Sequence, residues 1–561
     1  MFPKSSTPSS KSSSSWIRGV NIAGWLLAER FVTPFLFALN SCQLQGNWCY
    51  YENQLGAPPL SSRYHKYCDL WACQPHSIGV PMEDGTVHQD YPIDENSLLA
   101  SFSSKALAKE YMTSHWENFI TKEDVQVLAE SAGVEYVKVP IPFYAMSDIR
   151  DGEHWVDGQW LYFIRFVGWA RQYGIKVWVD MHTPFGNHTN FETSGGSSSS
   201  KCEHWIQSAE NVKRSMDGIK DLARAIMDDN LRDVVTGFGI LNEPYAGCSS
   251  EKIKKYSNDA LKAIREIMGH DTAVYVSDSF GAAVWNDVGW TDPSIYNNTY
   301  IGSNYFHIFS ESGRASSPKQ HIEHTCEQLG DEMVGCCYKD HPKNKQVSDG
   351  VSRIVGEWSA GYDTLPSEKL NEIMKDIRGQ KPRLMDQALS AQKMEFLANH
   401  VKSQMVTYES VDTGVSSGWF FWTLKMEGSE FVEWDFTRGM KEGWIPKMPQ
   451  NQTDSLSIFG SCDNIKAKTK DSIDDGLVVS DGKTMRSSAT NTRGKISGQY
   501  QSSQAMNIDE EKKKPKKSHW FHLFAVCFFG YGIWTVFLKN EFGFGRERSG
   551  YNSLHRTGLS I

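Results

Sequence analysis

Short apolar segments rich in β-branched residues alternate with longer amphipathic segments along most of the chain. Several of the short segments are apolar throughout, which is typical of parallel strands covered on both faces. The predicted strands are Ile17–Gly24, Tyr136–Phe143, Lys176–His182, Thr236–Pro244, Ala273–Phe280, Tyr300–Phe309, Arg353–Ser359 and Gly418–Leu424.

The segments between the predicted strands have helical periodicity. The clearest helices are predicted at Lys122–Ala132, Gln159–Tyr173, Glu210–Asp228, Lys252–Met268 and Asp386–Glu409. This alternation predicts an α/β fold, a (β/α)₈ TIM barrel over residues 16–448. The stretch Asn40–Ala100 is a long loop insertion after the first strand.

The chain outside the predicted barrel divides into four segments by composition. Residues 1–15 are Ser-rich and expected to be disordered, and residues 449–518 form a polar, flexible linker. The run Trp520–Leu538 has 19 residues without a formal charge. As a helix it extends about 28 Å, enough for a single transmembrane helix at 519–539, with 540–561 as a short tail.

The signals for membrane orientation conflict. The amino terminus lacks the apolar stretch of a signal peptide. Five lysines at 512–517 precede the span and slightly outnumber the basic residues after it, which favours a cytoplasmic barrel. Clustered cysteines and three glycosylation sequons favour an extracellular or lumenal barrel, the orientation we adopt. The sequons begin at Asn187, Asn297 and Asn451.

The 11 cysteines are concentrated in loop-like stretches, which indicates disulfides. A zinc site formed by His321, His324, Cys326 and Cys336 is the alternative, although this spacing fits no common zinc finger.

Composition narrows the function classes. With 40% hydrophobic and 12% aromatic residues, the chain is neither a disordered protein nor a collagen-like or coiled-coil one. Its net charge of −9 argues against a general nucleic-acid binder. Because it has neither a phosphate-binding loop nor a dinucleotide fingerprint, we expect no cofactor and no metal. We expect a monomer.

Two glutamates follow apolar strand residues at predicted carboxyl ends of strands, where TIM barrels carry their active sites. Glu243 follows the fourth strand and Glu357 follows the seventh. Two facing carboxyl groups suit glycoside hydrolysis, in which one is a protonated acid and the other attacks the anomeric carbon. A separation of roughly 5–5.5 Å between them is the geometry of a retaining enzyme.

Five motifs in order resemble the fungal exo-β-1,3-glucanases of glycoside hydrolase family 5. The resemblance covers roughly residues 16–446. The motifs are RGVNIAGWL at 18–26, LNEP at 241–244, GEWSA at 356–360, GWFFWTLKME at 418–427 and GWIP at 443–446.

The resemblance implies a retaining glucosidase with Glu243 as acid/base and Glu357 as nucleophile. It further implies that Asn242 hydrogen-bonds the sugar 2-hydroxyl, that His182 orients groups near the acid/base, and that Trp422 forms the floor under the terminal sugar.

The chain departs from the family pattern beside the sugar-binding subsite. Lys138 replaces the usual arginine on the second strand. The usual His-x-Tyr of the sixth strand becomes Asn304-Tyr305-Phe306, so Tyr305 or His307 takes over if the alignment shifts by one residue. Residues 183–188 replace the usual loop after the third strand.

The leading hypothesis is hydrolysis of β-1,3-glucan from its non-reducing end. The predicted span and the departures motivate a second hypothesis, a β-glucosidase acting on steryl or ceramide glucosides in the bilayer. A third is a carbohydrate-binding surface protein with impaired catalysis. The presence of both Glu243 and Glu357 argues against the third.

Overall fold

The structure of the protein, a computed structural model, describes residues 16–38, 80–81, 87–88, 92–100, 102, 104–186, 204–280, 285, 292–328, 351–370, 388–410, 417–427, 431–450 and 453–472.

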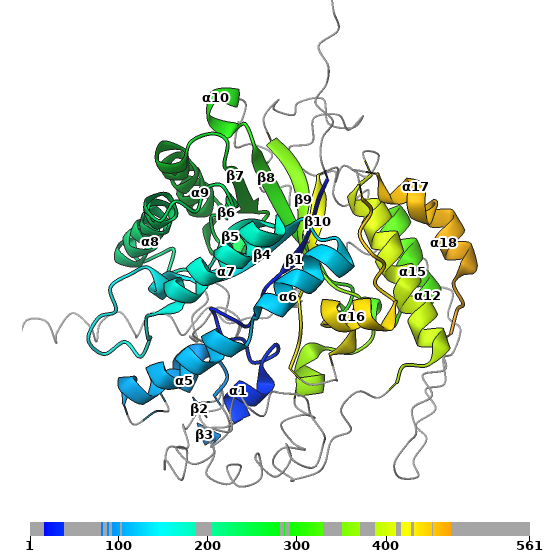
Figure 1. The fold of residues 1–561 in the computed structure, drawn as a ribbon, viewed down its shortest axis with the longest axis horizontal. Helices are drawn as coiled ribbons and strands as arrows, with labels where there is room; N and C mark the ends of the chain where they lie inside the picture. Colours follow the sequence, from blue (N-terminus) through cyan, green and yellow to red (C-terminus); the bar gives the residue numbers. More distant parts are fainter. Residues whose placement is uncertain are drawn as a thin grey trace, which may run out of the picture. The chain divides into compact units, whose positions relative to one another are not determined.

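Eight parallel strands close into a barrel in the order β1-β10-β9-β8-β7-β6-β5-β4 (Figure 1). They are β1 (Ile17–Asn21), β4 (Tyr136–Pro142), β5 (Lys176–Thr183), β6 (Val235–Gly239), β7 (Ala273–Ser277), β8 (Thr299–Tyr305), β9 (Val351–Trp358) and β10 (Gly418–Phe421). All eight predicted strands are confirmed. Several end earlier than predicted because apolar residues of the following loops, such as Ile240 and Ile308, are also buried.

Helices follow the strands around the outside of the barrel (Figure 1). The longer ones are α5 (Lys105–Asn118), α7 (Gln159–Tyr173), α8 (Ala209–Asp228), α9 (Ala246–Met268) and α15 (Ala391–Tyr408). The short ones are α1 (Pro34–Ala38), α4 (Glu95–Ala100), α6 (Lys122–Gln126), α10 (Pro293–Tyr296), α11 (Glu311–Arg314), α12 (Pro318–Glu323), α16 (Phe436–Glu442), α17 (Ser455–Phe459) and α18 (Cys462–Lys468). A two-stranded antiparallel sheet, β2 (Val80–Pro81) and β3 (Val87–His88), lies in the insertion after β1.

Local sequence signals explain where these helices begin and end. Thr121 and Asp124 form a reciprocal capping box at the start of α6. The predicted helix Lys122–Ala132 continues from α6 as a π-helical segment, η1 (Val127–Ala132). Helix α7 ends at Gly174, whose φ of 73° is accessible to glycine at little cost. Further single turns are η2 (Phe143–Ala145), η5 (His324–Gln328) and η7 (Val432–Trp434).

Large side chains fill the barrel interior opposite glycines on neighbouring strands. A Cβ at Gly19 would overlap the Phe420 ring, and one at Gly237 would overlap Trp178. Tyr275 likewise occupies the space beside two further glycines of β8 and β9. The interior is therefore a packed core.

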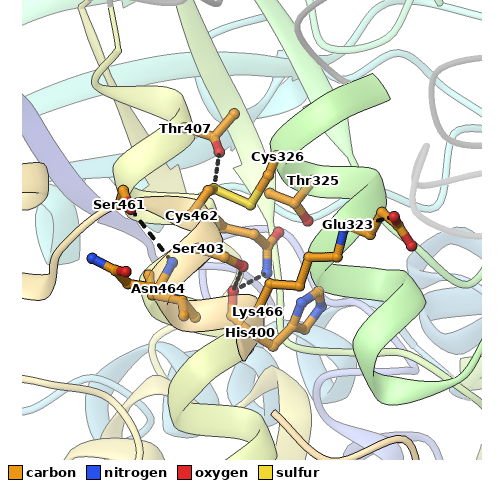
Figure 2. Close-up of a disulfide and its surroundings, with 12 residues drawn as sticks. Glu323, Thr325, Cys326, His400, Ser403, Thr407, Ser461, Cys462, Asn464 and Lys466 are labelled. Carbon is orange, nitrogen blue, oxygen red and sulfur yellow. Dashed lines mark hydrogen bonds and ion pairs between the residues drawn. A yellow bond between two sulfur atoms is a disulfide. The ribbon is translucent and has the colours of Figure 1, made fainter. Parts of the chain in front are cut away.

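The folded part extends beyond the predicted boundary at residue 448. Helices α17 and α18 pack against α15 and α12. A disulfide joins Cys326, in η5, to Cys462 at the start of α18 (Figure 2). Lys466 of α18 also pairs with Glu323 at 2.6 Å (Figure 2). The linker predicted to begin at residue 449 is therefore wrong up to residue 472, where the chain forms helices α17 and α18. These helices bury few side chains, so their sequences are as polar as that of a linker. The disulfide also removes Cys326 from the alternative zinc site.

Within the described ranges, no helix has the length and apolar character needed to cross a membrane. The predicted span at 519–539, the Ser-rich start, most of the linker and the tail lie outside the described residues.

Candidate active site

Two buried carboxyl groups meet at the carboxyl end of the barrel. Glu357 lies on β9 with 4% of its surface exposed, and Glu243 lies in the loop after β6 with 6% exposed. Glu243 has a φ of 43°, in the left-handed region that non-glycine residues rarely adopt. Such conformations persist where the surrounding structure holds them, often at functional sites.

Lys138 of β4 forms ion pairs with two carboxylates. Its Nζ lies 3.2 Å from Glu357 Oε1 and 3.5 Å from Asp180 Oδ2. The Lys138 side chain is 1% exposed. The ammonium therefore neutralises charge that has no access to water, in the place where the resemblance leads one to expect an arginine.

Asp180 and His182 share one face of β5 because side chains two residues apart on a strand point the same way. His182 Nδ1 lies 3.2 Å from Asp180 Oδ2, and Asn242 Nδ2 lies 3.4 Å from His182 Nε2. The His182 ring also stacks on Trp422, with ring centroids 5.7 Å apart. His182 thus contacts both Asn242 and Trp422, two other residues predicted for the site.

Glu243 is held by a different set of groups. Asn304 of β8 donates from Nδ2 to Glu243 Oε1 at 2.8 Å. Asn304 in turn accepts at Oδ1 from the Tyr275 hydroxyl at 3.4 Å. One carboxyl group therefore faces an ammonium, and the other faces a neutral amide.

These surroundings divide the charges between the two glutamates. Burial, together with the negative charge of Glu357, raises the pKa of Glu243 to about 8, although the Asn304 hydrogen bond opposes the rise. Burial also raises the pKa of Glu357, but Lys138 and His182 oppose that rise. Of the pair, Glu357 is the carboxyl group that holds the negative charge, and Glu243 is the one that holds the proton.

The neighbouring groups complete a balanced set of charges. Burial opposes charge on Lys138, but Asp180 and Glu357 outweigh it and raise the pKa of Lys138. Burial opposes charge on His182, but Asp180, Glu29 and Glu357 together outweigh it and raise the pKa of His182. The pKa of Asp180 is lowered, because Lys138 and His182 outweigh its burial. Lys138 and His182 thus both lie beside the carboxyl group of Asp180.

Asp180, His182 and Glu357 each offer one potential metal-ligand atom, and these atoms lie within 4.8 Å of one another. Lys138 Nζ already lies within ion-pair distance of both carboxylates. A divalent cation at this position would meet a buried ammonium of like charge. These residues therefore do not fit a metal ion.

Two predicted residues do not reach the site. Tyr305 stacks on Tyr408 of α15, with centroids 6.3 Å apart. His307 contacts His321 and His400, which belong to the surrounding helices. Since residues alternate along a strand, Asn304 faces the barrel mouth and Tyr305 faces away. Asn304 itself fills the position, and neither Tyr305 nor His307 replaces it.

Sequence reasoning missed two polar residues in this region. Asp180 was given no role, although its spacing of two from His182 on a strand would have placed both on one face. Glu29 is 1% exposed and accepts from the Gly24 backbone N–H at 3.0 Å. Burial raises the pKa of Glu29 to about 7, and its charged neighbours include His182 and Glu357. The sequence signal for Glu29 is a single acidic residue within an apolar run, where an unpaired carboxyl group would be costly to bury.

Comparisons with known proteins agree with this arrangement. Residues 101–382 match the family model described as Cellulase (glycosyl hydrolase family 5). The chain is 28% identical to the glucan 1,3-beta-glucosidase of Yarrowia lipolytica over 445 residues, which cover 77% of this chain and 88% of that protein. It is also 28% identical to the probable glucan 1,3-beta-glucosidase A of Aspergillus clavatus over 450 residues, with the same coverage, 77% and 88%.

Among solved structures, the rutinosidase from Aspergillus niger superimposes with a TM-score of 0.51 at 15% identity. The match covers 77% of this chain and 98% of that chain. At this level of identity the likeness shows a shared fold.

Proposed function

The chain belongs to glycosyl hydrolase family 5, and we propose that it is a retaining β-glucosidase that removes glucose from the non-reducing end of β-1,3-glucan. The observation that carries the proposal is the unequal setting of two buried carboxyl groups, Glu357 beside an ammonium and Glu243 beside an amide. The two relatives described above carry the name glucan 1,3-beta-glucosidase, which supports the substrate.

In the first step, the Glu357 carboxylate attacks the anomeric carbon and forms a glycosyl ester. The bond from that carbon to the bridging oxygen breaks at the same time. Glu243 gives its proton to this oxygen, so the shortened glucan leaves as a neutral alcohol. A raised pKa suits Glu243 to this role, because the residue must be protonated before it can act as an acid.

In the second step, Glu243 is ionised and takes a proton from water. The water oxygen attacks the anomeric carbon, the ester bond to Glu357 breaks, and glucose leaves with its original β configuration. Once Glu357 is esterified it no longer carries a charge that raises the pKa of Glu243, so the first step itself favours the base form required for the second.

The remaining site residues act on the substrate or on the carboxyl groups. We assign Asn242 to the sugar 2-hydroxyl and Trp422 to the face of the terminal sugar. His182 lies against both and orients them. Lys138 stabilises the charged form of Glu357 before attack and loses part of that partner when the ester forms.

The test uses purified protein with laminarin and an aryl β-glucoside. We expect glucose release from both, and Glu357→Ala should abolish release while binding of laminari-oligosaccharides persists. Proton NMR should show the β anomer as the first product. Absence of wild-type activity on both substrates contradicts the proposal, and an α product contradicts retention. Activity on a steryl or ceramide glucoside but not on laminarin would assign the enzyme to glycolipids instead.

We further propose that a single span at 519–539 anchors the barrel on the extracellular or lumenal side of a membrane. The Cys326–Cys462 disulfide supports an oxidising compartment. The sequon at Asn297 is on an exposed residue, as glycosylation requires. Protease treatment of sealed microsomal vesicles separates the two orientations, because a lumenal barrel is glycosylated and protected from the protease, whereas a cytoplasmic barrel is digested.

A further inference from the structure

Tyr275 of β7 is a fully buried aromatic residue at the centre of the barrel. It belongs to the interior cluster that also contains Trp178 and Phe420. A Cβ on Gly302 of β8 would overlap its ring, and a Cβ on Gly356 of β9 would overlap its hydroxyl. Two neighbouring strands are therefore shaped around this phenol, and its position is fixed.

Tyr275 contacts a partner of each of the two glutamates. Its hydroxyl donates to Asn304 Oδ1 at 3.4 Å, and Asn304 donates to Glu243. Lys138 Nζ lies 5.0 Å from the centre of the Tyr275 ring, within the range of a cation–π contact. The same ammonium pairs with Glu357.

The contact between Tyr275 and Asn304 contributes to the direction in which the Asn304 amide points. An asparagine amide has one accepting and one donating end, and its neighbours decide which end faces where. Because the Tyr275 hydroxyl donates to Oδ1, the NH₂ group is directed at Glu243 Oε1. An oxygen that already accepts this hydrogen bond is the poorer place for the proton, which favours Oε2 as the oxygen that carries it.

We propose that Tyr275 is a positioning residue that, through Asn304, fixes the oxygen from which Glu243 delivers its proton. This inference rests on the proposed acid/base role of Glu243. Removing the hydroxyl removes a contact that opposes turning of the amide oxygen toward Glu243, where this oxygen would accept the proton that the leaving group needs. The acid then points away from the glycosidic oxygen in part of the molecules.

The test variant is Tyr275→Phe, which keeps the ring and the Lys138 contact and removes one oxygen atom. Tyr300→Phe is the matched control, since Tyr300 packs on Trp178 in the same barrel interior. We expect kcat/KM of Tyr275→Phe to fall about tenfold on phenyl β-glucoside, whose poor leaving group needs the proton, the usual loss for one hydrogen bond. On 2,4-dinitrophenyl β-glucoside, whose dinitrophenolate group leaves without a proton, kcat/KM of Tyr275→Phe should stay within about twofold of the wild-type value. Equal losses on the two glucosides would indicate a purely structural role and overturn the inference.

A double-mutant cycle tests the route through Asn304. If Tyr275 acts by orienting this amide, Tyr275→Phe should change kcat/KM by less than about twofold in an Asn304→Ala background. An undiminished tenfold loss in that background would contradict the proposed route.

A measurement without turnover separates this inference from the function. Carbon-13 NMR of labelled glutamate carboxyls, with Glu243→Gln to assign the resonance, reports the pKa of Glu243. We expect Tyr275→Phe to raise that pKa, because the turned amide accepts from the protonated form. No change in that pKa overturns the role of Tyr275 even if wild-type enzyme is active, whereas a raised pKa in a protein without hydrolase activity would overturn the proposed function alone.

Discussion

The barrel mouth, where Lys138, Asp180, His182 and Glu357 meet, and a cluster of four histidines outside the barrel both bury titratable groups. The two regions differ in the partners that these groups have. At the mouth each charge faces an opposite charge. The histidine cluster lies between β8 and helices α12 and α15, and its members are 0 to 7% exposed. They are His307, His321, His324 and His400.

Within the described residues, the only titratable groups that shift the pKa values of His307 and His400 are other histidines of the cluster. Burial accordingly lowers the pKa of both rings well below the usual value, and that of His321 to about 4. His182 at the mouth is equally buried, yet Asp180 raises its pKa. Among equally buried histidines, an acidic partner therefore raises the pKa and its absence leaves burial to lower it.

The largest effect is expected from removing the central cation of the mouth. Lys138→Met leaves Asp180 and Glu357 without their ammonium, so the pKa of Glu357 should rise and the nucleophile should be protonated at neutral pH. We expect kcat/KM to fall by about 10²–10³. Stability should fall by about 3–5 kcal/mol, the usual cost of an unpaired buried charge. Kinetics on an aryl glucoside and urea unfolding measure the two effects.

Lys138→Arg is the matched control, because it keeps the charge. It should retain activity within about tenfold, since only the geometry of the ion pair changes. Wild-type kinetics in Lys138→Met would mean that the mouth does not depend on paired charge, and the comparison with the histidine cluster would lose its basis.

The sequence predicted the barrel because its strands depend on local signals. Strands that are apolar throughout, and glutamates placed just after them, are visible in the chain itself. Asn304 and Tyr305 show the limit. Alternate residues of β8 point to opposite faces of the strand. The sequence alone does not show which of these two adjacent residues points to the mouth. The role of Tyr275 depends on contacts between three strands, and no local pattern records them.

The histidine cluster was invisible for the same reason. His307, His321 and His400 are far apart in the sequence and lie on different elements. The sequence does not indicate helix α18 because its polar surface resembles a linker, whereas the structure ties it to the fold through the Cys326–Cys462 disulfide and the Lys466–Glu323 ion pair.

The second prediction concerns this disulfide, which lies near the histidine cluster (Figure 2). It links residues 136 positions apart. Removing a disulfide that closes a long loop typically costs about 2–4 kcal/mol. Cys462→Ser should therefore lower the urea midpoint without changing kcat/KM below the unfolding transition, because neither cysteine contacts the mouth. A loss of activity at full folding would show that the two regions are coupled.

The smallest effect, and the sharpest test of the comparison, comes from His400→Phe. Neither ring nitrogen of His400 has a hydrogen-bond partner among the described residues, and the ring stacks on Phe396. Its folded pKa is lowered, so the unfolded chain binds the proton more tightly. Stability is therefore complete above the unfolded pKa of about 6.5 and is lost as pH falls below it, by up to about 1.4 kcal/mol per pH unit for each histidine.

His400→Phe should remove one histidine's share of this loss while leaving stability at pH 7.5 unchanged or slightly higher. Urea unfolding of the wild type and the variant between pH 7.5 and 5 gives the two slopes, and His154→Phe, at an exposed histidine, controls for the loss of a surface imidazole. If the slope of His400→Phe matches that of the wild type, His400 has a charged partner after all. The two regions would then not differ in how they treat a buried histidine, since a histidine that keeps its proton in the fold costs no stability as the solution becomes acidic.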